Sequence, residues 1–196
     1  MRSPITYSRS SGHGSDLRLL VLTAVAVTDV RTSRLRLHAI DTSEAERIVG
    51  RRAGPGDEWA EDYPFEGDVG AVGGFLRATA AFGEQWPFGY YRIIRLSDGC
   101  AVGGAGFKGP PDGDCVEIGY GLVPSARGHG YAAEAVSALL TVAADNGLLK
   151  VIADTTPDNI ASQRTLERAG FRLVSTDAEL HHFEFLIQWA RAPQPE

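Results

Sequence analysis

Residues 127–134 read Arg-Gly-His-Gly-Tyr-Ala-Ala-Glu and lie between an extended apolar run and a long run of helix-forming residues. This order predicts a turn that ends at a helix N-terminus. The first turn of a helix leaves backbone N–H groups without partners, and the helix dipole adds partial positive charge there. Because Gly128 and Gly130 have no Cβ, a bulky anion can approach those N–H groups. The stretch therefore predicts a phosphate site, reinforced by the side chains of Arg127 and His129.

The glycine spacing leaves a second ligand open. Gly128-x-Gly130-x-x-Ala133 also fits a loose dinucleotide fingerprint, and an acid, Asp154, follows about 20 residues on. Against this alternative, residues 124–127 separate the apolar run from the first glycine, and too few residues follow to build a doubly wound sheet. The Gly-Lys-Ser/Thr of a nucleoside-triphosphate loop does not occur here.

Two blocks of the sequence resemble one known family. The first is similar to the acetyl-coenzyme A pyrophosphate motif of the GNAT acetyltransferases: Arg127-x-x-Gly130-x-Ala132. At the expected distance, a second block resembles their C-terminal signature: Asn159-x-x-Ser162-x-x-x-Leu166-Glu167-x-x-Gly170-Phe171. Residues 117–120 and 131–135 resemble the Rim-type branch, which is ribosomal-protein-alanine acetyltransferase-like. The resemblance covers roughly Thr32 to Trp189.

The resemblance implies an α/β (α+β) fold of three layers. Its central sheet is mixed and mostly antiparallel, with helices on both faces and one splayed pair of parallel strands. Residue patterns predict strands at 34–40, 88–96, 101–108, 115–123, 150–154, 171–174 and 180–188, and helices at about 42–52, 69–82, 132–145 and 159–169.

We expect two parts in the chain. Residues 1–30 are predicted to be an N-terminal extension, partly disordered, in which 17–27 form either an extra strand or a helix. The extension is expected to pair with the sheet edge or with a second subunit in a homodimer. Residues 31–190 are predicted to form the GNAT domain.

Composition narrows the class of partner. The 196 residues are 43% hydrophobic and 22% charged, as in a globular domain, and the net charge of −6 argues against nucleic acid. The two cysteines, Cys100 and Cys115, fall at opposite ends of a predicted hairpin, so we expect reduced thiols in a cytoplasmic protein. We found no transmembrane stretch or targeting signal and expect no membrane partner.

The resemblance implies acetyl-coenzyme A as cosubstrate and no metal. The pantetheine arm is expected between the strands at 115–123 and 150–154, with N–H groups near Leu122 and Val123 facing the thioester carbonyl. The amide of Asn159 is expected to contact the arm, and it also suits a helix N-cap. The pyrophosphate is expected on six consecutive residues: Arg127, Gly128, His129, Gly130, Tyr131 and Ala132.

Two residues are candidates for proton transfer. Glu117 is the candidate general base, because it shares a strand face with two glycines beside the expected cleft; an ordinary strand glutamate is the alternative. Many family members have a tyrosine general acid where Leu166 stands here. Ser162, one helical turn before it, is the substitute candidate, and a water is the alternative. The neighbouring His181 and His182 point to opposite faces of a strand and cannot bind one metal ion together.

The resemblance implies an N-acetyltransferase that acts on a primary amine by direct attack. The alternative is a non-catalytic coenzyme A-binding sensor or partner module, which Leu166 alone supports. The loop at 57–68 holds six acids with three aromatic residues among them. Acids at a cleft attract cations, so the loop favours a peptide N-terminus or a polyamine-like or aminoglycoside-like acceptor, although such loops are usually only solvated.

Overall fold

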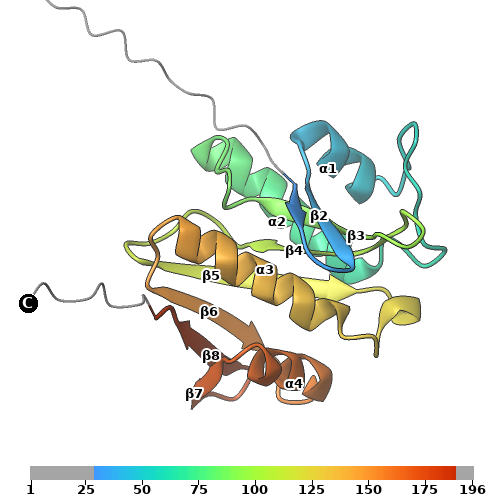
Figure 1. Cartoon of the computed structure of the whole chain (residues 1–196). Helices are drawn as coiled ribbons and strands as arrows, with labels where there is room; N and C mark the ends of the chain where they lie inside the picture. Colours follow the sequence, from blue (N-terminus) through green and yellow to red (C-terminus); the bar gives the residue numbers. More distant parts are fainter. Residues whose placement is uncertain (1–28, 189–196) are drawn as a thin grey trace, which may run out of the picture.

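The computed structural model describes residues 29–188, which form one eight-stranded sheet with helices on both faces (Figure 1). The sheet order is β1-β2-β3-β4-β5-β6-β8-β7. Its strands are β1 (Val30–Arg31), β2 (Leu35–Ala39), β3 (Tyr90–Arg95), β4 (Ala101–Phe107), β5 (Cys115–Leu122), β6 (Lys150–Thr155), β7 (Arg172–Thr176) and β8 (His181–Leu186). The α-helices are α1 (Thr42–Val49), α2 (Glu66–Phe82), α3 (Tyr131–Asp145) and α4 (Ile160–Arg168). The mixed, mostly antiparallel fold is as predicted.

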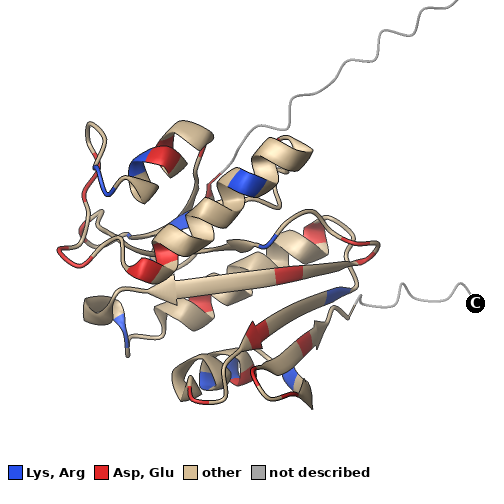
Figure 2. Cartoon of the chain, turned by 180° about the vertical axis from the view of Figure 1, so that it is seen from behind, with Lys and Arg blue, Asp and Glu red and all other residues tan. Residues whose placement is uncertain are grey.

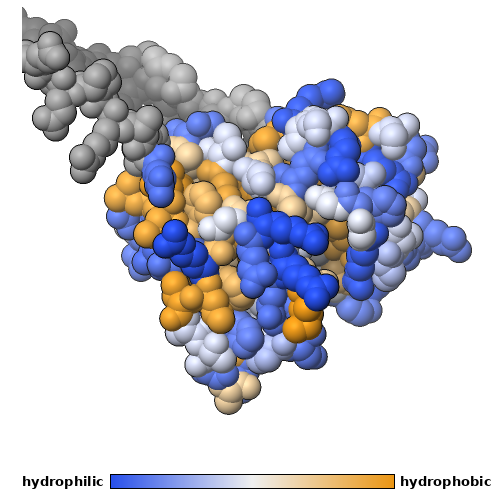
Figure 3. Space-filling model, turned by 60° about the horizontal axis from the view of Figure 1, so that its bottom comes forward, coloured by the Kyte–Doolittle hydropathy of each residue, from blue (hydrophilic) through white to orange (hydrophobic). Residues whose placement is uncertain are grey.

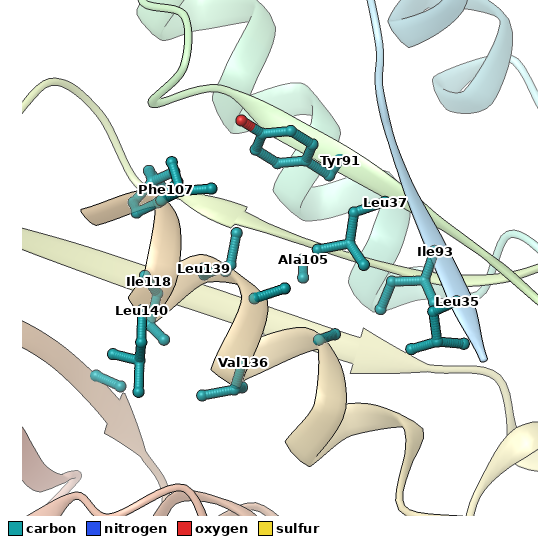
Figure 4. Packing of buried hydrophobic residues seen from close by; sticks show 14 of the residues in the cluster. Leu35, Leu37, Tyr91, Ile93, Ala105, Phe107, Ile118, Val136, Leu139 and Leu140 are labelled. Carbon is teal, nitrogen blue, oxygen red and sulfur yellow. The ribbon is translucent and has the colours of Figure 1, made fainter. Parts of the chain in front are cut away.

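Two apolar clusters hold the three layers together. The larger one joins α3 to the side chains of β2, β3, β4 and β5, as Figure 4 shows for Val136 and Leu139 against Leu37, Ile93 and Ala105. The smaller one joins α1 and α2 to the opposite face of the sheet. Tyr90 of β3 belongs to the smaller cluster and its neighbour Tyr91 to the larger one, because successive side chains of a strand point to opposite faces of the sheet. The result is a rigid support beneath the phosphate loop.

The one parallel pair in the sheet opens along its length. β5 and β6 pair at Cys115–Lys150, Val116–Val151 and Glu117–Ile152, and the pairing stops there. β5 continues to Leu122 in partnership with β4 alone. The predicted splayed pair is therefore present, and its gap begins after Glu117.

Glycines on one sheet face near this gap leave room for aromatic side chains. A Cβ on Gly104 would lie 1.7 Å from the hydroxyl oxygen of Tyr90, and one on Gly121 would lie 2.6 Å from the ring of Phe65. Aromatic side chains therefore lie where these two glycines have none. This face is the one that α2 covers.

Several element boundaries differ from the prediction. α1 ends at Val49 rather than near Arg52, and the two-residue β1 was not expected. α2 begins at Glu66, three residues before the predicted start, so the last part of the predicted acidic loop is helical. The predicted tail and the element at 17–27 lie outside the described residues. Cys100 and Cys115 are both free thiols.

The edge strand β7 leaves apolar side chains in contact with solvent. β7 is exposed along its whole length, and Leu173 and Val174 are each 51% exposed. Figure 3 brings the lower side of the molecule forward and shows hydrophobic patches separated by hydrophilic residues. The predicted homodimer stays a prediction. Among the helices described, none is long and apolar enough to cross a membrane.

Candidate active site

The predicted phosphate loop has the backbone that its glycines were expected to allow. Gly128 and Gly130 have φ values of +80° and +78°, a region that favours glycine, and Gly130 is the N-cap of α3. A Cβ on Gly128 would meet no other atom of the described chain within 4 Å. The loop therefore presents open backbone at the N-terminal end of α3. Such an arrangement suits a phosphate group.

The side chains around this loop are arranged differently from the prediction. Arg127 turns back, so that its Nε donates to the carbonyl oxygen of Leu122 at 3.0 Å. A second arginine, Arg34, donates from Nη1 to the carbonyl oxygen of His129 at 2.9 Å and pairs with Glu134 at 2.6 Å. Arg34 could not be predicted as part of this site, because nothing in the local sequence indicates that the start of β2 reaches a loop about 95 residues away.

The hydrogen-bond pattern of β5 decides which of its backbone groups face the gap. The N–H of Val123 donates to the carbonyl oxygen of Val102 at 3.0 Å, and the N–H of Lys108 donates to the carbonyl oxygen of Glu117 at 2.9 Å. In an antiparallel pair, bonded positions alternate with positions that point the other way. Tyr120 and Leu122 therefore direct their backbone groups away from β4 and toward the gap. Of the two predicted carbonyl-binding N–H groups, that of Leu122 faces the gap and that of Val123 is bonded to β4.

Helix α4 brings a hydroxyl pair to the gap. The side chain of Asn159 accepts from the N–H of Ser162 at 3.1 Å, which confirms the predicted N-cap. The hydroxyl groups of Ser162 and Tyr120 lie 2.9 Å apart, in hydrogen-bond contact. Leu166 is fully buried in the core. A tyrosine hydroxyl is thus present beside Ser162, supplied by β5 instead of by position 166.

A cavity of about 520 Å³ connects these parts. Its wall includes Tyr120 and Gly121 of β5, the segment 153–155 of β6, and both Asn159 and Ser162. On its other side it reaches α2 and the aromatic residues around it. The size is that of a small-molecule site. The cavity therefore runs from the β5–β6 gap to the α2 face of the sheet.

Glu117 lies at the closed end of the gap, where β5 and β6 still pair. Its carboxylate forms an ion pair with Lys108, which lies on the cavity wall, while Glu117 itself is outside the wall. The side chain of Glu117 is 30% exposed. Its assignment as general base stays a prediction, and the lysine fixes where the carboxylate lies.

A second carboxylate does line the cavity, and sequence analysis placed it in a loop. Asp68 is in the first turn of α2 and only 2% exposed. It accepts from the hydroxyl group of Tyr90 at 3.1 Å and from the N–H of Phe65 at 3.3 Å. Burial raises the pKa of Asp68 from 3.8 to about 7, although both hydrogen bonds act in the opposite direction. A carboxyl with this pKa changes charge near neutral pH.

The other acids of segment 57–68 are occupied elsewhere or lie away from the cavity. Asp57 pairs with the buried Arg92 at 2.8 Å, and Asp62 accepts from the N–H of Ser125 at 2.9 Å. None of the five acids other than Asp68 lines the cavity. Figure 2 shows acidic and basic residues intermixed around α1 and α2. Of the six acids in the predicted acidic loop, the buried Asp68 is thus the one that lines the cavity, and a role of the loop in attracting a cation stays a prediction.

The two adjacent histidines are separated, as predicted. His182 lies between two carboxylates, with Nδ1 at 2.8 Å from Asp154 and Nε2 at 2.9 Å from Asp177. The bond to Asp177, followed by that to Asp154, raises the pKa of His182. Within residues 29–188, no group of three or more His, Cys, Asp or Glu side chains is arranged to hold a metal ion.

Comparisons with known proteins identify the family. The family model described as "Acetyltransferase (GNAT) domain" matches residues 34–172. An uncharacterized N-acetyltransferase of Bacillus subtilis, YjdG, is 30% identical over an alignment of 169 residues that covers 81% of this chain and 98% of that protein. The chain belongs to the GNAT acetyltransferases. It is thus an acyl-coenzyme A-dependent acetyltransferase. The dinucleotide alternative is wrong, since the sheet has a single parallel strand pair instead of a doubly wound order.

Solved GNAT structures share this fold. RimL, a ribosomal L7/L12 α-N-protein acetyltransferase in complex with coenzyme A, aligns with a TM-score of 0.60 at 20% identity, over 82% of this chain and 98% of its own. MccE, a microcin C7 self-immunity acetyltransferase in complex with acetyl-coenzyme A and AMP, aligns with a TM-score of 0.56 at 16% identity, over 80% and 94%. Rim-type enzymes are thus among the structural neighbours, as the sequence predicted.

Proposed function

We propose that this GNAT protein transfers the acetyl group of acetyl-coenzyme A to a primary amine by direct attack, with Glu117 as general base. The observation that carries the proposal is the single cavity that joins the open edge of β5 to the α2 face of the sheet. One end of it suits the thioester arm, because Tyr120 and Leu122 direct backbone groups there. The other end has room for an acceptor. An amine on the α2 side would therefore face the thioester across β5.

The cosubstrate site fits the loop and the gap together. Open backbone at Gly128 and the N-terminus of α3 would hold the pyrophosphate, and Asn159 on the cavity wall would contact the pantetheine. Acetyl-coenzyme A supplies the activated acetyl group when bound. RimL and MccE were solved with coenzyme A and acetyl-coenzyme A, which supports the same ligand here.

Proton transfer needs one group that accepts and one that donates. Glu117 would accept the proton of the acceptor's ammonium through a water, from the position where Lys108 holds it. The Ser162–Tyr120 hydroxyl pair would donate to the departing thiolate sulfur. Burial raises the pKa of Tyr120, so its hydroxyl stays protonated at neutral pH and can donate.

The experiment is thiol release from acetyl-coenzyme A with a panel of amines, including peptide N-termini and cationic small molecules. Release that depends on the amine, together with an acetylated product, is expected. Binding of acetyl-coenzyme A without thiol release for any amine would favour the sensor alternative. A cytoplasmic location and a homodimer are further expectations of this proposal, to be checked by fractionation and by mass measurement in solution.

A further inference from the structure

We propose that Asp68 binds the ammonium group of the acceptor before that group loses its proton to Glu117, and that the acceptor is a compact monoamine with an apolar, preferably aromatic, body. The inference rests on the proposed function, because it assigns the acceptor end of the same cavity. It names both the recognising side chain and the class of substrate.

Asp68 differs from the other charged residues of the cavity wall. Those residues are Asp68, Lys108 and Asp154, and the last two are held by Glu117 and His182. Within residues 29–188, no Lys, Arg or His lies within 4.0 Å of the Asp68 carboxylate; its hydrogen-bond donors are Tyr90 and the N–H of Phe65. Both donors are uncharged. The carboxylate is therefore buried without a counter-ion, although burying a charge is costly unless it is paired.

The surroundings of Asp68 would favour an organic cation over a hydrated one. Much of the nearby cavity wall is aromatic or glycine, and its aromatic members are Phe65, Phe75, Phe88, Tyr90, Phe107 and Tyr120. Aromatic faces attract ammonium groups and also bury apolar bodies. A cation that enters here would neutralise the carboxylate beside aromatic side chains. The binding contribution of such a charge-assisted bond is larger than that of a neutral one.

The position of Asp68 places the bound cation beside the reaction site. The hydroxyl of Tyr90, which donates to Asp68, lies over Gly104, and Gly104 pairs with Gly121 of β5. Phe65, whose N–H donates to Asp68, lies over Gly121 itself. Asp68 is therefore next to the part of β5 that borders the gap.

Size and charge restrict the acceptor further. The cavity of about 520 Å³ must also admit the reacting end of the thioester arm, so the acceptor has to be compact. An extended polyamine would need several unpaired carboxylates, and the described cavity wall offers one. A carboxylate-bearing acceptor would be repelled by Asp68. A single ammonium on an aromatic or aliphatic body fits all three conditions.

The test compares Asp68→Asn with a matched control, Glu66→Gln, using 2-phenylethylamine as acceptor. Glu66 is in the same helical turn, exposed, and paired with Arg51. Asp68→Asn should raise KM for the amine roughly 10- to 100-fold and change kcat less, since it removes a charge-assisted contact. Glu66→Gln should leave both constants unchanged. The neutral analogue 2-phenylethanol should inhibit wild type and Asp68→Asn equally.

A second variant keeps the test valid if Asp68→Asn folds poorly. Tyr90→Phe leaves the carboxylate in place and removes one of its donors, so KM should change by a smaller factor in a folded protein. An unchanged KM in Asp68→Asn, or a loss confined to kcat, would overturn the inference.

Calorimetric titration of 2-phenylethylamine separates this inference from the proposed function. Amine binding that is lost in Asp68→Asn, in a protein that acetylates no amine, would sink the proposed function and leave the Asp68 site standing. Turnover in wild type with the same KM in Asp68→Asn would sink the Asp68 site alone.

Discussion

Replacing Asp68 with asparagine should make the protein more stable near neutral pH. The folded state holds the proton of Asp68 up to a pKa of about 7, whereas the ordinary value is 3.8. Folding therefore favours the protonated carboxyl. The protein is consequently at its full stability with respect to Asp68 below about pH 3.8, and this stability is lost as the pH rises through 7. The full loss is an upper limit of about 4 kcal/mol. Asparagine removes this loss, because it is neutral at every pH.

The amide also gives up part of the hydrogen bonding to Tyr90 and Phe65, which costs about 1–2 kcal/mol. The net gain near pH 8 is then about 2 kcal/mol, or roughly 4–8 °C in melting temperature. Between about pH 4.5 and about pH 8 the effect of the substitution should change by about 3 kcal/mol in the stabilising direction.

Urea denaturation followed by circular dichroism at both pH values measures this change, with Glu66→Gln as the control that should show none. An equal effect of Asp68→Asn at the two pH values would refute the assigned pKa and its cause. Stabilisation combined with weaker amine binding would fit a site where function costs stability.

Five further substitutions test the cosubstrate site and the proton path. Acetyl-coenzyme A should raise the melting temperature of wild type, and Gly130→Trp should abolish that rise; a folded variant that still binds would place the phosphate site elsewhere. Glu117→Gln should lower kcat roughly 10²–10⁴-fold with unchanged coenzyme A affinity, and Lys108→Met, which frees the carboxylate, should alter kcat as well. Ser162→Ala and Tyr120→Phe should each slow turnover, and the double variant should lose less than the product of the two, because the hydroxyls act together; independent effects would contradict a shared path.

Most of the fold could be predicted from the sequence, because its signals are local. The predicted start of α1 at residue 42 is correct, and Asp41 and Glu44 form the full capping box of this helix. The start of α2 was missed because its N-cap is Phe65, which lacks the usual capping side chain, and glycines follow. Asp68, three residues on, accepts from the Phe65 N–H and was the available signal.

Only the parts of the candidate site that lie within one continuous motif could be predicted from the sequence. The turn that leads into α3 and the Asn159 cap are each continuous in sequence, and the structure has both; that the turn binds phosphate stays a prediction. The pairs that shape the chemistry join distant positions: Asp68 meets Tyr90 across 22 residues, and Tyr120 meets Ser162 across 42. Such contacts are set by packing and leave no periodic signal.

The most direct test of the central claim is a turnover measurement on the purified full chain. Acetyl-coenzyme A and 2-phenylethylamine are supplied together, free thiol is followed with time, and the amine product is analysed by mass spectrometry. Thiol release that depends on both substrates, with one acetyl group gained by the amine for each thiol formed, is the predicted result. Thiol release that is absent both with 2-phenylethylamine and with every amine of the panel, or that proceeds equally without any amine, would contradict acetyl transfer to an amine.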